Sequence, residues 1–78
     1  MLSLEDLREL TGVWALKIRA VEDGVLPKLS GLELQFEPKD VVSLCLATMA
    51  GEYGMEEANN VIDEFHLEEL SFNKKPVK

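Results

Sequence analysis

The first apolar residues of the chain recur at helical spacing. They are Leu4, Leu7 and Leu10. Ser3 and Asp6 are spaced as in a capping box, in which the side chain of each residue binds a backbone amide of the other. Together these patterns predict a first helix over about residues 4–10. Thr11-Gly12 is expected to end it, because glycine tolerates the left-handed backbone at a helix C-terminus.

A second helix is predicted after this turn, from about Trp14 to Asp23. Its expected inward-facing residues are Val13, Ile18 and Val21. The pair Asp23-Gly24 is a turn signal and is expected to end this helix.

The pattern changes to alternation over residues 25–36, "VLPKLSGLELQF". After a proline and a Ser-Gly turn, one side carries Leu32, Leu34 and Phe36. Glu33 and Gln35 lie on the other side. This alternation predicts a small two-stranded hairpin, or wing, with the second strand clearer than the first.

Two further helices are predicted in the second half. Pro38 suits the first position of a helix, and "PKDVVSLCLATMA" after it is apolar on most sides, as expected of a central core helix. Residues 51–54, "GEYG", predict a break. "MEEANNVIDEFHLEEL" then predicts a last helix over residues 55–70. Its apolar stripe is Met55, Ala58, Val61, Ile62 and Phe65.

Length and composition indicate one small folded domain. The chain has 78 residues, of which 46% are hydrophobic, so its core is near the lower limit for independent stability. We expect a domain over residues 1–72 and a flexible basic tail over residues 73–78. The start lacks the layout of a signal peptide, and no run approaches the roughly 18–20 apolar residues of a membrane span. A cytoplasmic protein is expected.

The charge is strongly acidic and unevenly placed. The chain has 15 acidic and 8 basic residues, a net charge of −7. From Asp40 to Phe72 there are eight acids and no Lys or Arg. Contacts of basic residues with phosphate supply most non-specific DNA affinity. The acidic second half would repel phosphate, so any DNA contact must come from the first half.

Four stretches in this order resemble the MerR family of winged helix-turn-helix proteins and its shorter relatives, including phage excisionases. They are "LRELTGV" (7–13), "KIRAVEDGVLP" (17–27), "FEPKDVVSL" (36–44) and "GMEEANNVI" (54–62). The resemblance implies a mostly α fold, with about four helices and a small two-stranded wing. It also implies a small DNA-binding protein that regulates transcription or a phage or mobile element.

The family reads DNA with its second helix and clamps the backbone with its wing. Arg19 stands at the family's helix-two arginine, but the two following aromatic positions are Ala20 and Val21, and the wing arginine position is Leu34. The expected DNA-binding residues are Trp14, Lys17, Arg19 and Lys28.

An alternative hypothesis uses the acidic second half. Small chaperone modulators of MerR-like shape bind a basic protein surface, and an antirepressor-like role would use acidity in the same way. The expected partner-binding residues are Glu56, Glu57, Asp63, Glu64 and Glu68. DNA binding is the leading hypothesis, and binding of a basic protein partner is the alternative.

Catalysis is not expected. His66 has no nucleophile or second ligand spaced to use it, and Cys45 lies in the most apolar helix, as an inert core thiol would. The chain has no glycine-rich phosphate loop and no metal-ligand cluster. We expect no catalytic residue, no metal and no cofactor, and we leave a homodimer open.

Overall fold

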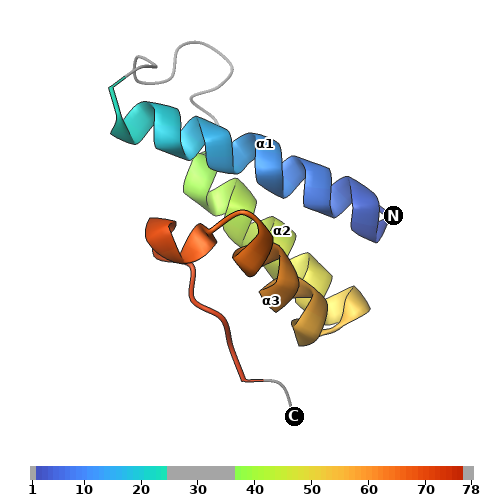
Figure 1. The fold of residues 1–78 in the computed structure, drawn as a ribbon. Coiled ribbons are helices and arrows are strands. Elements are labelled where there is room, and N and C mark those ends of the chain that lie inside the picture. The colour runs from blue at the N-terminus through green and yellow to red at the C-terminus, as the bar shows by residue number, and fades with distance from the viewer. Residues whose placement is uncertain (1, 25–36, 77–78) are drawn as a thin grey trace.

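A computed structural model describes residues 2–24 and 37–76, and all regular secondary structure in this part of the chain is helical (Figure 1). Its elements are α1 (Leu4–Glu22), α2 (Pro38–Tyr53), α3 (Met55–Glu64) and the short 3₁₀ helix η2 (Leu67–Leu70). Helix α2 packs against both α1 and α3, which confirms its prediction as the central helix. Figure 1 shows α3 returning beside α2, and the C-terminal segment leaving η2.

The predicted fold class is wrong, although mostly α is right. The described residues hold three α-helices and no strand, rather than about four helices with a two-stranded wing. A helix-turn-helix needs a turn at Thr11-Gly12, but α1 runs without a break through both residues. The hairpin predicted over residues 25–36 lies outside the described residues.

The two residues expected to end the first helix are accommodated inside α1. Thr11 is fully buried, and its hydroxyl donates to the carbonyl of Leu7, at 2.7 Å. A Cβ atom at Gly12 would lie 3.0 Å from two ring carbons of Phe65. The glycine therefore permits a close contact with the segment after α3, and it does not terminate a helix.

The unbroken helix changes which α1 residues face the core. The buried ones are Leu7, Thr11, Ala15 and Ile18. Their spacing of four, four and three residues keeps them on one side of a single helix. Val13 was expected to face inward, but it falls off this side and is 51% exposed. Ile18 is buried as predicted, and Val21 is half-buried.

Three of the four predicted helix starts are confirmed, at Leu4, Pro38 and Met55, whereas the start predicted at about Trp14 is wrong because α1 is continuous there. The Ser3 hydroxyl accepts from the Asp6 amide at 3.0 Å, and Asp6 Oδ2 accepts from the Ser3 amide at 3.4 Å, which is the capping box. Pro38 occupies the start of α2. Helix α2 continues through Gly51 and ends before Gly54, whose φ of 101° favours glycine. The break is therefore narrower than predicted.

The core draws on all four elements. Its buried apolar residues are Leu7, Ala15, Ile18, Val42, Cys45, Met49, Ala58, Val61, Ile62, Leu67 and Leu70. The stripe predicted for the last helix is confirmed: Ala58, Val61 and Ile62 are buried, while Met55 and Phe65 pack against the core half-buried. Burial raises the pKa of the Cys45 thiol, and nearby Thr11 acts in the opposite direction.

The last helix is shorter than predicted. Helix α3 ends at Glu64, and a turn through His66, in the left-handed region at φ 56°, leads into η2. A continued α-helix would carry Leu67 and Leu70 away from the core side, because each residue advances by about 100°. The turn returns both leucines to the core, where they are buried.

Candidate partner-binding site

Two of the residues predicted to bind DNA lie together on α1. Trp14 is half-buried and packs against the core. The Lys17 ammonium lies over its ring, 5.1 Å from the ring centroid, in a cation–π contact. Lys28 lies outside the described residues. The structure thus brings Trp14 and Lys17 together on one helix surface.

Arg19 is directed at the end of α3. Its Nη2 donates to the carbonyls of Phe65 and His66 at 3.1 and 3.2 Å, and its Nη1 lies 3.0 Å from Glu69 Oε1. Carbonyls at a helix C-terminus carry partial negative charge, so a cation there is favourable. Arg19 therefore joins α1 to the segment after α3, while its predicted DNA contact stays a prediction.

Glu64, predicted for the partner surface, is engaged with α1. Arg8 donates to both of its carboxylate oxygens, from Nε at 2.8 Å and from Nη2 at 2.6 Å. The hydrogen bond from Arg8 lowers the pKa of Glu64, and the pair raises the pKa of Arg8. A two-point contact of this kind fixes geometry as well as charge. Glu64 thus ties α3 to α1.

Asp63 and Glu68 lie beside a lysine of the C-terminal segment. Lys74 Nζ is 2.9 Å from Asp63 Oδ1. The hydrogen bond to Asp63 raises the pKa of Lys74, with added contributions from the charges of Asp63 and Glu68. Two predicted partner-binding acids thus already face a lysine of this chain.

The five predicted acids do not form one surface. Residues seven apart on a helix share a side, so Glu56 lies with Asp63, and Glu57 lies with Glu64 on the side toward α1. Glu56 is exposed and Glu57 is half-buried. Glu68 comes from η2. The side shared by Glu56 and Asp63, together with Glu68, is the acidic surface considered below.

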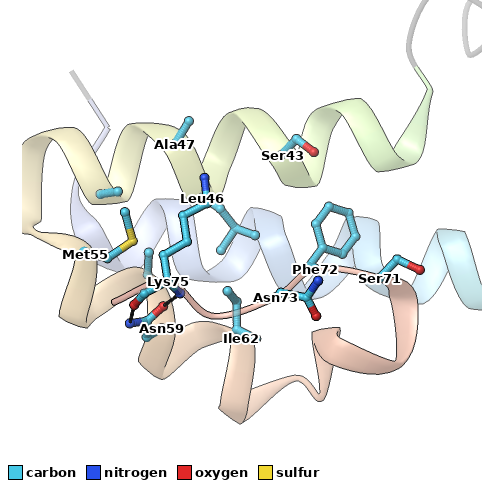
Figure 2. A pocket seen from close by; sticks show the side chains of 12 residues that line it. Ser43, Leu46, Ala47, Met55, Asn59, Ile62, Ser71, Phe72, Asn73 and Lys75 are labelled. Atoms are coloured by element: carbon cyan, nitrogen blue, oxygen red, sulfur yellow. Dashed lines mark hydrogen bonds between the residues drawn. The ribbon is translucent and has the colours of Figure 1, made fainter. Parts of the chain in front are cut away.

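A groove of about 580 Å³ lies between α2 and α3 (Figure 2). Apolar side chains of both helices line it, among them Leu46, Ala47 and Ala50 of α2 and Met55, Ala58 and Ile62 of α3. The segment after η2 forms a further wall with Ser71, Phe72, Asn73 and Lys75. In Figure 2 the Phe72 ring extends from this segment toward α2.

Asn59 fastens this segment to α3. Its Nδ2 donates to the Lys75 carbonyl at 2.7 Å, and its Oδ1 accepts from the Lys75 amide at 3.0 Å (Figure 2). One side-chain amide thus binds both main-chain groups of one residue. Asn59 was not predicted from the sequence, because it stands beside Asn60 in a polar stretch and no local signal separates the two.

No protein-family model, curated protein or solved structure matches this chain significantly. The resemblance to the MerR family therefore stays a prediction. Among residues 2–24 and 37–76, no three His, Cys, Asp or Glu side chains converge to hold a metal ion. No helix in these ranges is both long and apolar enough to cross a membrane.

Proposed function

We propose that this chain is a non-enzymatic, cytoplasmic protein-interaction module that binds a basic segment of a partner protein. The acidic surface of Glu56, Asp63 and Glu68 is its binding surface. One observation carries the proposal: Lys74 lies against Asp63, and the charge of Glu68 further raises the pKa of Lys74. The chain's own lysine thus occupies the position that a partner's lysine would take.

The distribution of charge supports the same proposal. Eight acids and no Lys or Arg lie between Asp40 and Phe72, which attracts basic partners and repels phosphate. The arginine predicted to contact DNA is already bonded to two carbonyls and to Glu69. Surface charges of this kind act mainly on the rate and specificity of association.

A basic peptide without aromatic residues tests the proposal. We expect a fluorescein-labelled twelve-residue peptide of lysine and glycine to bind the full chain with a salt-dependent affinity. Reversing two acids, in Asp63→Lys/Glu68→Lys, should weaken binding several-fold at low salt and less at high salt, because salt screens exposed charges over about 8–10 Å. Fluorescence anisotropy measures both effects.

The matched control reverses two acids elsewhere. Glu9 and Glu52 are exposed on α1 and α2, and Glu9→Lys/Glu52→Lys changes the net charge by the same amount. We expect it to weaken peptide binding less than the first pair does. Equal losses in the two variants would show that only total charge matters. Tighter binding of a random-sequence DNA duplex than of the peptide, by the unaltered chain, would favour the DNA hypothesis instead.

A further inference from the structure

We infer that the groove between α2 and α3 binds an extended partner segment with an aromatic residue followed by lysines. We infer also that residues 71–76 of this chain occupy that site and compete with the partner. The inference rests on the proposed function and adds to it the shape and sequence character of the partner segment. Three contacts along the tail, at Phe72, Lys74 and Lys75, carry it.

Asn59 recognises main chain rather than a particular side chain. It binds the amide and the carbonyl of Lys75, at 3.0 and 2.7 Å. A neighbouring β-strand pairs with an extended residue through the same two groups. Any extended segment presents this donor and acceptor, so Asn59 would bind a partner's main chain as readily as the tail.

The groove offers more apolar surface than the tail covers. Phe72 is half-buried and packs against the core. A volume of about 580 Å³ is still open beside it, bounded by small and apolar side chains such as Leu46, Ala47 and Ala50. Pockets that hold an aromatic anchor among apolar neighbours are common centres of binding energy. An incoming aromatic residue therefore fits the position of Phe72.

The acidic residues beside the groove indicate that the partner segment is positively charged. Lys74 follows the aromatic residue by two positions and pairs with Asp63, near Glu68. The tail "SFNKK" is thus basic and aromatic within a chain of net charge −7. A partner segment with an aromatic residue followed by lysines can contact the apolar groove, the Asn59 side-chain amide and the acidic surface at the same time.

The tail is held by contacts that open easily. Its bonds to Asn59 are exposed, and in the Lys74–Asp63 pair the side chains are 41% and 56% exposed. Segments with few buried contacts separate from a fold at low free-energy cost. Because the tail is covalently attached, its effective concentration at the groove is high, so it lowers the apparent affinity for a free segment.

The test uses the full chain and a fluorescein-labelled synthetic peptide of residues 71–78, SFNKKPVK. Lys75→Pro removes from the tail the amide that donates to Asn59, and it leaves both helices unchanged. Lys75→Ala keeps that amide and removes the same side chain. Losing one hydrogen bond from the competing tail should tighten peptide binding to Lys75→Pro about five-fold relative to Lys75→Ala.

Asn59 provides the second comparison. In the Lys75→Pro chain, Asn59→Ala should weaken peptide binding at least about five-fold, because the peptide's own main chain loses its partner. Asn60→Ala, at the neighbouring exposed position, should not change it. Equal affinities of the Lys75→Pro and Lys75→Ala chains, or of the two asparagine variants, would overturn the inference.

Two further measurements separate this inference from the proposed function. A peptide with alanine in place of its phenylalanine should lose most of its affinity. If it binds equally well, charge alone drives binding. The groove is then excluded as the binding site for the aromatic residue, while the proposed function stands. Hydrogen exchange of the Lys75 amide should be slower in the unaltered chain and in Asn60→Ala than in Asn59→Ala. Equal exchange rates of this amide in the unaltered chain and in Asn59→Ala would also overturn the inference.

Discussion

Gly12 of α1 lies directly against the ring of Phe65, the residue that follows α3. A Cβ atom at position 12 would lie 3.0 Å from both Cε1 and Cζ of the ring. This spacing is tighter than ordinary van der Waals contact. The absence of a side chain at position 12 thus lets α1 and the end of α3 approach closely, with the Arg8–Glu64 and Arg19–Glu69 pairs on either side along α1.

Gly12→Ala is therefore expected to destabilise the fold. Glycine inside a helix is usually less stable than alanine by about 0.5–1 kcal/mol. Here the added methyl group must displace the Phe65 ring, and overpacking costs about 1–3 kcal/mol. We expect a net loss of about 1 kcal/mol in the free energy of unfolding, measured by urea denaturation.

Gly51→Ala is the matched control for this prediction. Gly51 lies in α2, and nothing comes within 4 Å of an added Cβ atom. This variant should gain about 0.5–1 kcal/mol from helix propensity alone. Phe65→Leu should relieve the contact, so Gly12→Ala should cost less in that background. Equal effects at the two glycines would show that Phe65 does not constrain position 12.

Arg19→Ala is expected to lower stability whether or not the chain binds DNA. The guanidinium bonds to two carbonyls at the end of α3 and to Glu69, and its side chain is 34% exposed. Hydrogen bonds from charged groups are stronger than neutral ones, although exposure reduces their contribution. We expect a loss of about 1–2 kcal/mol in the free energy of unfolding.

Lys39→Ala serves as its control. Lys39 pairs with Glu22 at 3.5 Å, and both side chains are about half exposed. Such a pair contributes at most about 1 kcal/mol. Thermal unfolding should therefore show a clear drop for Arg19→Ala and a smaller one for Lys39→Ala. If Arg19→Ala lowers the melting temperature no more than Lys39→Ala does, the contacts of Arg19 with the Phe65 and His66 carbonyls contribute nothing to the stability of the fold.

Met49 and Leu44 of α2 offer a test of the core. Met49 is completely buried, whereas Leu44 is 69% exposed although three apolar residues follow it directly. Truncating a buried methionine leaves a cavity, so Met49→Ala should cost about 2–5 kcal/mol. Leu44→Ala should change the free energy of unfolding by less than about 0.5 kcal/mol. Similar losses in urea denaturation would contradict this arrangement of α2.

Local signals predicted the elements that depend on neighbouring residues. The capping box at Ser3, the proline at the start of α2 and the apolar stripe of α3 are each encoded within a few residues. Each of these predictions is confirmed. Their geometry follows from helix periodicity and from the unpaired amides at a helix start, so no tertiary information is needed.

The errors arose where a distant contact decides a residue's role. Gly12 was taken as a helix end, but its partner is Phe65, more than fifty residues away. Asn59 was missed because its partner is the main chain of Lys75, a group that every residue carries. The contact between Glu64 and Arg8 was likewise not predicted, because the two residues lie 56 positions apart, and the assignment of Glu64 to a partner surface stays a prediction. Sequence patterns show residue types at fixed spacing and contain none of these long-range pairings.

The Arg8–Glu64 contact predicts a dependence of stability on pH. The hydrogen bond from Arg8 lowers the pKa of Glu64 in the folded chain below its ordinary value of 4.5. As pH falls, the unfolded chain therefore takes up a proton at this position before the folded chain does. The stabilising contribution of Glu64 is complete above about pH 5 and is lost as pH falls through 4.5 toward the lower, folded value.

Glu64→Gln removes the titrating group, so the unaltered chain should be the more stable of the two near pH 7. The difference between their free energies of unfolding should shrink as pH is lowered from about 5 to 3. Glu9→Gln, which removes an exposed carboxylate of α1, is the matched loss of one charge. Urea denaturation at steps of half a pH unit measures these differences. A difference between the unaltered chain and Glu64→Gln that stays constant from pH 7 to pH 3 would contradict the effect of Arg8 on Glu64.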